Sequence, residues 1–178
     1  MNKKELRKQK KEITNKAEAD SAIFNSVTSL KEFKNAHTIF IYLSTADEPE
    51  TDAIIAEALR MGKRVCVPRC RKAPQMDAVV IRSLSAFKTG AYGIREPLGS
   101  ETVEKENIDL AIIPCVKAGT DGRRLGHGKG YYDCFMSGAR FLKVCLCYCE
   151  NITDAIETEE HDILMDIVIT QNDVFMIR

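Results

Sequence analysis

Short apolar runs rich in β-branched and aromatic residues recur along the chain and predict buried strands. They cover residues 38–43, 64–68, 79–81, 110–113, 144–147 and 167–169. Between the first two runs, apolar residues from Ile54 to Leu59 recur at helical spacing, with Thr51 as a candidate N-cap and Gly62 at the C-terminal end. Strand and helix therefore alternate. This predicts an α/β fold: a single three-layer domain over residues 1–178, with a largely parallel central sheet and helices on both faces.

Polar segments follow the predicted strands. In parallel sheets, ligands bind beyond the carboxyl ends of the strands. Glu48 follows strand 38–43, and the long connection 115–130 follows strand 110–113. Connections of that length are usually functional or disordered. The segment 92–97 breaks the periodicity, and we interpret it either as a third wall of a site or as a plain turn.

Composition restricts the partners. The length of 178 residues suits one domain, and 44% hydrophobic residues suffice for a substantial core. With 26 basic and 26 acidic residues the formal net charge is zero, so we expect no nucleic-acid or membrane partner, and any basic site must be local. No apolar run approaches the roughly 20 residues that cross a bilayer, and the N-terminus lacks a hydrophobic signal core. A cytoplasmic, monomeric enzyme is the expectation.

The seven cysteines have irregular spacings and no C-x-x-C pair, so neither a disulfide framework nor a zinc ribbon is predicted. Cys145, Cys147 and Cys149 alternate, but in a strand their Cα atoms would lie roughly 7 Å apart, which suits one zinc ion poorly. We interpret these three, with Cys66 and Cys115, as reduced and buried small hydrophobic residues.

The strongest candidate site is a glycine-rich stretch. It consists of Arg124, Leu125, Gly126, His127, Gly128, Lys129, Gly130, Tyr131, Tyr132 and Asp133. Glycines at alternate positions free the backbone for φ > 0 and let a ligand approach bare N–H groups. Arg124 and Lys129 add positive charge, and the last three residues indicate the first turn of a helix whose amide end would face the same anion. The stretch predicts a phosphate-binding loop.

Standard phosphate fingerprints do not fit this loop. In a P-loop, Ser or Thr would follow Lys129, but the chain has Gly130, and Arg123 stands where the first glycine belongs. A dinucleotide fingerprint would need glycine at Tyr131. A glycine-rich turn with solvated charges is the alternative. It accounts less well for the two adjacent tyrosines and for the cations Arg124 and Lys129.

The N-terminal segment predicts an amphipathic helix with a basic side. Leu6, Ile13, Ala17 and Phe24 recur at intervals that mark a core-facing stripe. The basic residues are Lys3, Lys4, Arg7, Lys8, Lys10 and Lys11. Two interpretations stay open: a solvated face, which is what most charge runs are, or an arrangement in which Lys3 and Arg7 lean over the phosphate loop.

These residues resemble the 5-formyltetrahydrofolate cyclo-ligase family, also called 5,10-methenyltetrahydrofolate synthetase. The similar segments run in order over nearly the whole chain, at residues 3–7, 47–51, 92–94, 124–133 and 161–166. The resemblance implies ATP- and magnesium-dependent closure of 5-formyltetrahydrofolate to its 5,10-methenyl form, with release of ADP and phosphate. Phosphorylation of the formyl oxygen would precede attack by a folate nitrogen, so that positioning and charge neutralisation carry most of the catalysis.

The resemblance also implies residue roles. The ATP-binding residues would be Lys3, Lys4, Glu5, Leu6, Arg7, Arg124, Leu125, Gly126, His127, Gly128, Lys129, Gly130, Tyr131 and Tyr132. The folate-binding residues would be Leu43, Glu48, His127, Gly128, Lys129, Gly130 and Tyr131. Asp133 and Asp162 would bind magnesium, and Lys129 and Arg124 would be catalytic.

Three of these carboxylates also have plain structural interpretations. Glu48, expected to accept two hydrogen bonds from the pterin edge, also suits an acid close to a helix start. Asp133 would favour its own helix dipole as well as magnesium. Asp162, taken by itself, is a solvated loop acid.

The chain departs from the family pattern at two places. Ala118-Gly119 stand where the family commonly has Phe-Asp, and Cys134 where many relatives have Arg. The alternative function is a non-catalytic regulator that binds nucleotide or folate on the same fold. RNA binding by the basic N-terminal segment is disfavoured, because the chain has no Trp, no net charge and no aromatic platform beside these cations.

Overall fold

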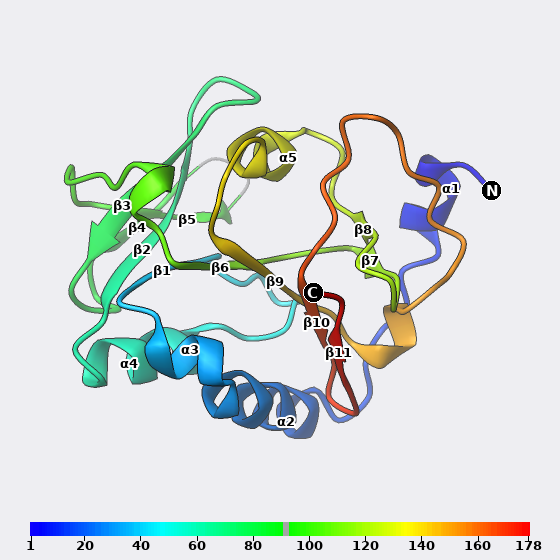
Figure 1. The fold of residues 1–178 in the computed structure, drawn as a ribbon, viewed down its shortest axis with the longest axis horizontal. Coiled ribbons are helices and arrows are strands. Elements are labelled where there is room, and N and C mark those ends of the chain that lie inside the picture. The colour runs from blue at the N-terminus through cyan, green and yellow to red at the C-terminus, as the bar shows by residue number, and fades with distance from the viewer. Residues whose placement is uncertain (91–92) are drawn as a thin grey trace.

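The computed structural model describes residues 1–90 and 93–178. Its centre is a seven-stranded sheet in the order β11-β10-β9-β6-β1-β2-β3 (Figure 1). The strands are β1 (Thr38–Ile41), β2 (Arg64–Cys70), β3 (Met76–Ile81), β6 (Leu110–Ile113), β9 (Leu142–Leu146), β10 (Ile167–Ile169) and β11 (Val174–Met176). The five inner strands run parallel, and the edge strands β3 and β11 run antiparallel to their neighbours. The prediction of a largely parallel sheet is confirmed.

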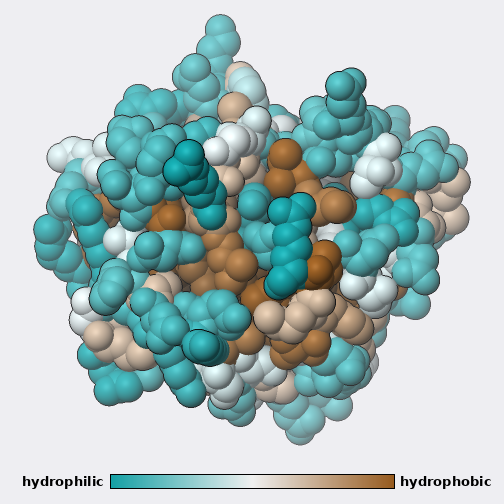
Figure 2. Space-filling model, in the orientation of Figure 1, coloured by the Kyte–Doolittle hydropathy of each residue, from teal (hydrophilic) through white to brown (hydrophobic). Residues whose placement is uncertain are grey.

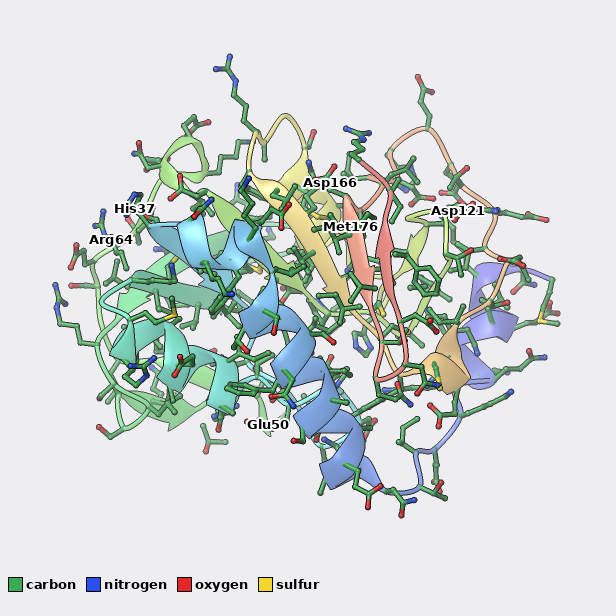
Figure 3. All side chains as sticks on the ribbon, turned by 60° about the horizontal axis from the view of Figure 1, so that its bottom comes forward. His37, Glu50, Arg64, Asp121, Asp166 and Met176 are labelled. Carbon is green, nitrogen blue, oxygen red and sulfur yellow. The ribbon has the colours of Figure 1, made fainter. Side chains whose placement is uncertain are left out.

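Apolar layers form on both faces of the sheet. Helices α2 (Lys16–Ser29), α3 (Lys31–Asn35) and α4 (Asp52–Arg60) cover one face, and Figure 3 shows them in front of the strands. α5 (Tyr131–Met136) lies on the opposite face (Figure 1). Because successive side chains in a strand point to opposite faces, Ile39 and Ile41 pack with Phe33 of α3, while Phe40 packs with Phe135 of α5. The expected three-layer α/β fold is confirmed.

The degree of burial explains which strands could be predicted from the sequence. All four residues of β6 are buried, and a parallel strand covered on both faces is a continuous apolar run. β11 lies at the sheet edge and leaves Val174 and Met176 exposed, so its pattern is weak and it was not predicted. Figure 2 shows apolar residues in the middle of one face, where β6 and β9 lie in Figure 1, with hydrophilic residues around them.

The N-terminal segment does not form one helix, and that prediction was wrong. α1 (Lys3–Lys8) ends before Gln9, and α2 begins only at Lys16. The apolar stripe is divided between two clusters, because Leu6 packs with Leu125 and Ile156 whereas Phe24 packs against the main core. Because the two halves of the stripe pack at separate places, they do not have to lie on one continuous helix.

In the part of the chain that the structure describes, two hairpins and the helical turns η2 (Lys105–Asn107) and η3 (Cys149–Asn151) were not predicted. β4 (Phe87–Thr89) pairs with β5 (Arg95–Pro97), and β7 (Lys117–Ala118) pairs with β8 (Arg124–Leu125). The second hairpin lies within the connection 115–130, which was expected to be a long loop. The first contains most of segment 92–97, although Tyr92 itself lies outside the described residues.

α4 spans the predicted region, but Thr51 does not cap it with its side chain. The Thr51 hydroxyl donates to the Tyr42 carbonyl oxygen at 2.7 Å and accepts from the Ser44 N–H at 3.2 Å. The Glu50 carboxylate instead accepts from the Asp52 N–H at 2.5 Å. Gly62 follows the last turn with φ 74°, the conformation expected of a C-terminal glycine. Thr51 therefore secures the loop before α4, not the helix end.

The cysteines largely match their interpretation. All seven are free thiols, and Cys66, Cys115, Cys145 and Cys147 are buried. Burial raises the pKa of Cys66 to about 12, so this thiol stays protonated. Cys149 is only half-buried, because β9 ends at Leu146 and Cys149 belongs to η3. Within residues 1–90 and 93–178, no group of three or more Cys, His, Asp or Glu side chains could hold a metal ion.

Candidate functional site

A cavity of about 560 Å³, hereafter the strand-end cavity, opens beyond the carboxyl ends of β1, β2 and β6. Its walls come from five parts of the chain: the β1 end and its loop, the β2 end, β5, the β6 end, and the glycine loop with α5. The lining residues are Tyr42, Leu43, Thr45, Glu48, Pro68, Cys70, Arg71, Ile94, Arg95, Glu96, Pro114, Arg124, Gly126, His127, Gly128, Lys129, Gly130, Tyr131, Tyr132 and Asp133. The site lies at the sheet end that the fold predicts.

Arginine side chains pack directly on the glycine loop. A Cβ on Gly126 would come within 2.7 Å of Nη2 of Arg124, and one on Gly128 within 3.2 Å of the Arg7 guanidinium. Gly128 also has φ 93°, a conformation that L side chains rarely adopt. Gly128 therefore requires glycine by its backbone conformation, and at Gly126 the Arg124 guanidinium occupies the space that a side chain would take.

Arg7 and Arg124 hold the loop from two sides. Nε of Arg7 donates to the Gly126 carbonyl oxygen at 2.7 Å, which joins α1 to the loop. The Arg124 side chain is only 4% exposed, and its Nε donates to the Pro114 carbonyl oxygen at 2.8 Å. Its Nη1 lies 3.4 Å from Oδ1 of Asp133, and the guanidinium stacks over Tyr132 at 5.4 Å. Positive charge is thus fixed beside exposed backbone amides.

Lys129 also lines the strand-end cavity. Cys70 lines the same cavity, and burial together with the Glu96 charge raises the pKa of its thiol, while the Lys129 charge opposes that rise. Tyr131 donates its hydroxyl proton to the Arg71 carbonyl oxygen at 3.0 Å, which connects α5 to the turn after β2. The glycine loop is consequently held at both of its ends.

Glu48 is a buried carboxylate that stays ionised. Its Oε2 accepts from the Thr45 N–H at 2.9 Å, and its Oε1 lies 3.3 Å from Nε2 of His127. Burial alone would raise the pKa of Glu48, but the hydrogen bonds from His127 and Thr45 outweigh it and hold this pKa below its ordinary value. At neutral pH the cavity therefore has an acidic side facing the cationic loop.

The loop that carries Glu48 is anchored by residues that gave no sequence signal. The Tyr42 hydroxyl donates to the Pro49 carbonyl oxygen at 2.6 Å. The Tyr148 hydroxyl contacts Oδ1 of Asp20 at 2.5 Å and the Glu48 carbonyl oxygen at 3.2 Å. Both tyrosines lie in apolar runs that also suit ordinary core residues, so only the three-dimensional structure reveals their role.

The structure brings most of the predicted site residues together. Leu43, Glu48, Arg124 and residues 126–133 line the cavity, and Arg7 contacts the loop. Lys3, Lys4, Glu5, Leu6, Leu125 and Asp162 are not among the lining residues. Leu6 and Leu125 are buried together, and Glu5 forms a capping box with Asn2 at the start of α1. Lys3 and Arg7 were the two residues that one interpretation placed over the loop. Arg7 contacts the loop, whereas Lys3 forms an ion pair with Asp162.

The two proposed magnesium ligands have different surroundings. Asp133 lines the cavity, and its side chain is 28% exposed beside Arg124. Asp162 forms an ion pair with Lys3 at 2.6 Å and accepts from the Glu159 N–H at 2.7 Å. Protein-bound Mg²⁺ usually takes one or two carboxylates and completes its shell with phosphates and water. Asp133 fits that donor set, and the magnesium roles of Asp133 and Asp162 both stay predictions.

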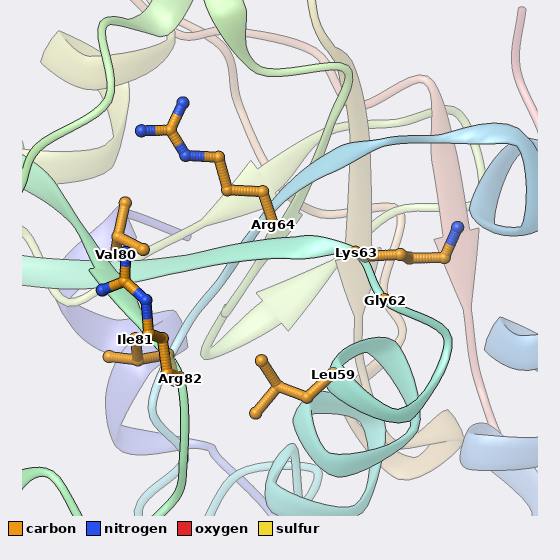
Figure 4. A pocket seen from close by; sticks show the side chains of 7 residues that line it. All are labelled: Leu59, Gly62, Lys63, Arg64, Val80, Ile81 and Arg82. Carbon is orange, nitrogen blue, oxygen red and sulfur yellow. The ribbon is translucent and has the colours of Figure 1, made fainter.

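A second depression, of about 380 Å³, lies at the other end of β2 (Figure 4). It is lined by Leu59, Gly62, Lys63, Arg64, Val80, Ile81 and Arg82. Arg64 and Arg82 both pair with the Glu101 carboxylate, and the Lys63 ammonium donates to backbone carbonyl oxygens. Its cations are already engaged by the protein, so the strand-end cavity is the better candidate site.

A glycine loop with fixed cations at the carboxyl ends of a parallel sheet is a typical arrangement for binding an anion, such as a phosphate group. Comparison with known proteins identifies the family. The sequence model that describes the 5-formyltetrahydrofolate cyclo-ligase family matches residues 2–171 of this chain. The chain belongs to this family, which confirms the resemblance read from the sequence.

Relatives and solved structures agree with this assignment. A Caenorhabditis elegans protein named probable 5-formyltetrahydrofolate cyclo-ligase is 33% identical over 87% of this chain and 82% of its own length. The structure of Aquifex aeolicus 5,10-methenyltetrahydrofolate synthetase superposes with a TM-score of 0.87 at 27% identity, covering 100% of this chain and 94% of that one. The expected enzyme class is confirmed.

Two further expectations concern membranes and location. No helix in the described part of the chain has the length and apolar character needed to cross a membrane. The Arabidopsis thaliana relative, 28% identical, is named as mitochondrial. A cytoplasmic location therefore stays a prediction.

The charge of Glu48 predicts a pH-dependent contribution to stability. Because the folded pKa is lowered, the contribution is full above the ordinary glutamate pKa of 4.5 and is lost as pH falls through the folded pKa. Glu48→Gln should lower the free energy of unfolding by about 1–3 kcal/mol near neutral pH. Urea unfolding from about pH 3 to 7 should show the gap to the parent closing below pH 4.5. The exposed Glu106→Gln is the control. A gap that widens in acid would contradict the assignment.

Proposed function

We propose that the protein converts 5-formyltetrahydrofolate to 5,10-methenyltetrahydrofolate at the expense of ATP, with release of ADP and phosphate. The observation that carries this proposal is the pairing, within one cavity, of a cation-backed glycine loop with the ionised Glu48. The cationic glycine loop suits a triphosphate, and the Glu48 carboxylate suits the N–H donors of an aminopyrimidine edge. Family membership supports the same reaction.

The phosphate half of the site is formed by the glycine loop. Its backbone amides and the Lys129 ammonium would receive the phosphate oxygens, with Arg7 and Arg124 fixed behind the loop. Lys3 and Lys4 on α1 would extend this cationic side toward the nucleotide. Since Arg124 is held by Pro114 and Asp133 before any ligand arrives, it would need little reorganisation during the reaction.

The folate half is formed around Glu48. A carboxylate accepts two parallel N–H donors, which a pterin presents at its 2-amino and neighbouring ring positions. Leu43 and Tyr131 provide apolar and aromatic surface on the cavity wall. His127 contacts Glu48 and belongs to the glycine loop, so it would lie between the two substrates.

The chemistry needs the two ligands in contact. The formyl oxygen attacks the γ-phosphorus while the bond from phosphorus to the ADP oxygen breaks, which turns a poor leaving group into a phosphate ester. The N10 nitrogen then attacks the formyl carbon and loses its proton to water, the carbon–oxygen bond breaks, and phosphate leaves. Lys129 and Arg124 would neutralise charge on the transferring group, and a magnesium ion held by Asp133 would neutralise the remaining phosphate charge.

The test of the proposal is a direct assay. Purified protein, 5-formyltetrahydrofolate and Mg-ATP should give the methenyl product, followed by its absorbance, together with ADP. Omitting either nucleotide or divalent ion should stop the reaction. Ligand binding without turnover would favour the alternative, a non-catalytic regulator. No observation on the described residues supports that alternative. Product formed without nucleotide would refute the mechanism.

Lys129→Met should lower kcat strongly. The substitution keeps the apolar stem and removes only the ammonium, and the loss of one preorganised charge-stabilising donor costs on the order of 10²–10³ in rate. ATP affinity, supported also by Arg7, Arg124 and backbone amides, should fall much less. Calorimetry and product formation on one sample separate these effects, with Lys31→Met on α3 as the control. A kcat within about threefold of the parent would remove Lys129 from the catalytic residues.

Asp133→Asn should change the magnesium dependence more than the fold. A carboxylate in the first turn of a helix contributes only about 0.3–1 kcal/mol to stability, and asparagine keeps an Oδ1 that can accept the hydrogen bond from Nη1 of Arg124. The Mg²⁺ concentration at half-maximal rate should rise about tenfold, corresponding to 1.36 kcal/mol, while thermal stability stays close to that of the parent. The exposed Asp154→Asn serves as the control. Collapse of stability with an unchanged magnesium optimum would make Asp133 structural.

A further inference from the structure

The β4–β5 hairpin forms one wall of the strand-end cavity through Ile94, Arg95 and Glu96. Hydrogen bonds close both ends of its stem: the Gly90 N–H donates to the Ile94 carbonyl oxygen at 2.7 Å, and the Leu98 N–H donates to the Ala86 carbonyl oxygen at 2.9 Å. The hairpin is a separate two-stranded sheet. A side-chain connection to the loop that carries Glu48 helps to fix its position over the cavity.

Arg95 supplies that connection. Its Nη1 and Nη2 donate to the two carboxylate oxygens of Asp52 at 3.0 and 2.8 Å, and Nη2 also lies 3.3 Å from the Ser44 carbonyl oxygen. The guanidinium lies 5.6 Å from the ring centroid of Phe87, which packs against the main core. A forked pair of this kind fixes orientation as well as distance.

The partners of Arg95 lie at the two ends of the loop that carries Glu48. Ser44 begins this loop, Asp52 is the first residue of α4 after it, and Glu48 lies between them in the chain. One guanidinium consequently spans the base of the Glu48 loop and attaches it to the hairpin. A change in either wall would be transmitted to the other through Arg95.

We propose that Arg95 is a positioning residue for the folate half of the site, which sets the spacing between the hairpin wall and Glu48. Arg95 acts through its contacts with Asp52 and Ser44 and takes no part in phosphoryl transfer. The proposal rests on the proposed function, since it assigns this half of the cavity to folate. It predicts that loss of the Arg95–Asp52 pair weakens folate binding selectively, because the glycine loop is held separately by Arg7 and Arg124.

The experiment compares Arg95→Met, Arg95→Lys, Asp52→Asn and the double variant Arg95→Met/Asp52→Asn. Arg95→Met and Asp52→Asn should each raise the KM for 5-formyltetrahydrofolate about tenfold, corresponding to 1.4 kcal/mol, with the KM for ATP within about twofold of the parent. Arg95→Lys keeps the charge but loses the fork, so its effect should be intermediate. The double variant should be no worse than the poorer single variant, because both remove one interaction.

Arg60→Met is the matched control. Arg60 forms a similar forked pair with Glu57 on the same helix, at 2.8 and 2.6 Å, but neither residue lines the cavity. Both KM values should stay unchanged in this variant. Thermal melting of every variant identifies any that fail to fold, and Arg95→Lys and Asp52→Asn still decide the question if Arg95→Met is one of them.

Three results would overturn the proposal: equal rises in both KM values, unchanged folate KM in the Arg95 and Asp52 variants, or additive effects in the double variant. Calorimetric titrations with 5-formyltetrahydrofolate and with ATP make the test independent of turnover. If the parent binds folate but produces no methenyl product, the proposed function fails, and selective loss of folate affinity in Arg95→Met still supports the positioning role.

Discussion

The burial of the Arg124 guanidinium is the constraint on which the site depends. Arginine remains charged under all ordinary conditions, so a buried guanidinium must find hydrogen-bond and charge partners. Arg124 finds them at the end of β6, through the Pro114 carbonyl oxygen, and in α5, through Asp133 and the Tyr132 ring. It also fills the space where a side chain at position 126 would lie. One side chain thus fixes the strand end, the glycine loop and the following helix relative to one another.

The opposite wall solves the inverse problem, the burial of a negative charge. Glu48 remains ionised because Thr45 and His127 supply hydrogen bonds, and the tyrosines at positions 42 and 148 hold the backbone of its loop. His127 belongs to the glycine loop, so the two charged walls touch at this residue. In the proposed function, the polyanion would lie on the loop side of this contact and the hydrogen-bond donor edge on the Glu48 side.

Much of the fold and part of the site could be predicted from local patterns. β6 and β10 were predicted with their observed limits, because strands buried on both faces are unbroken apolar runs. The glycine loop was found because its backbone conformation requires glycine at fixed positions. The break between α1 and α2 was not predictable, since Leu6 and Phe24 fit one helical stripe but are buried in different clusters. The pairings of Arg95 with Asp52 and of Tyr148 with Asp20 gave no signal, because the partners are distant in the sequence.

The departures at positions 118 and 119 illustrate how a hairpin can keep its geometry while its side chains change. Ala118 pairs with Arg124 across the β7–β8 hairpin, and the Gly119 N–H donates to the Arg123 carbonyl oxygen at 2.8 Å. Both contacts use backbone atoms, so they do not depend on the side chains at these positions. At Gly119 a Cβ would come within 2.5 Å of Oδ1 of Asp121, a carboxylate that also pairs with Arg123. The glycine therefore fits the local arrangement of this hairpin, and Arg124 keeps its place at the cavity without the Phe-Asp pair.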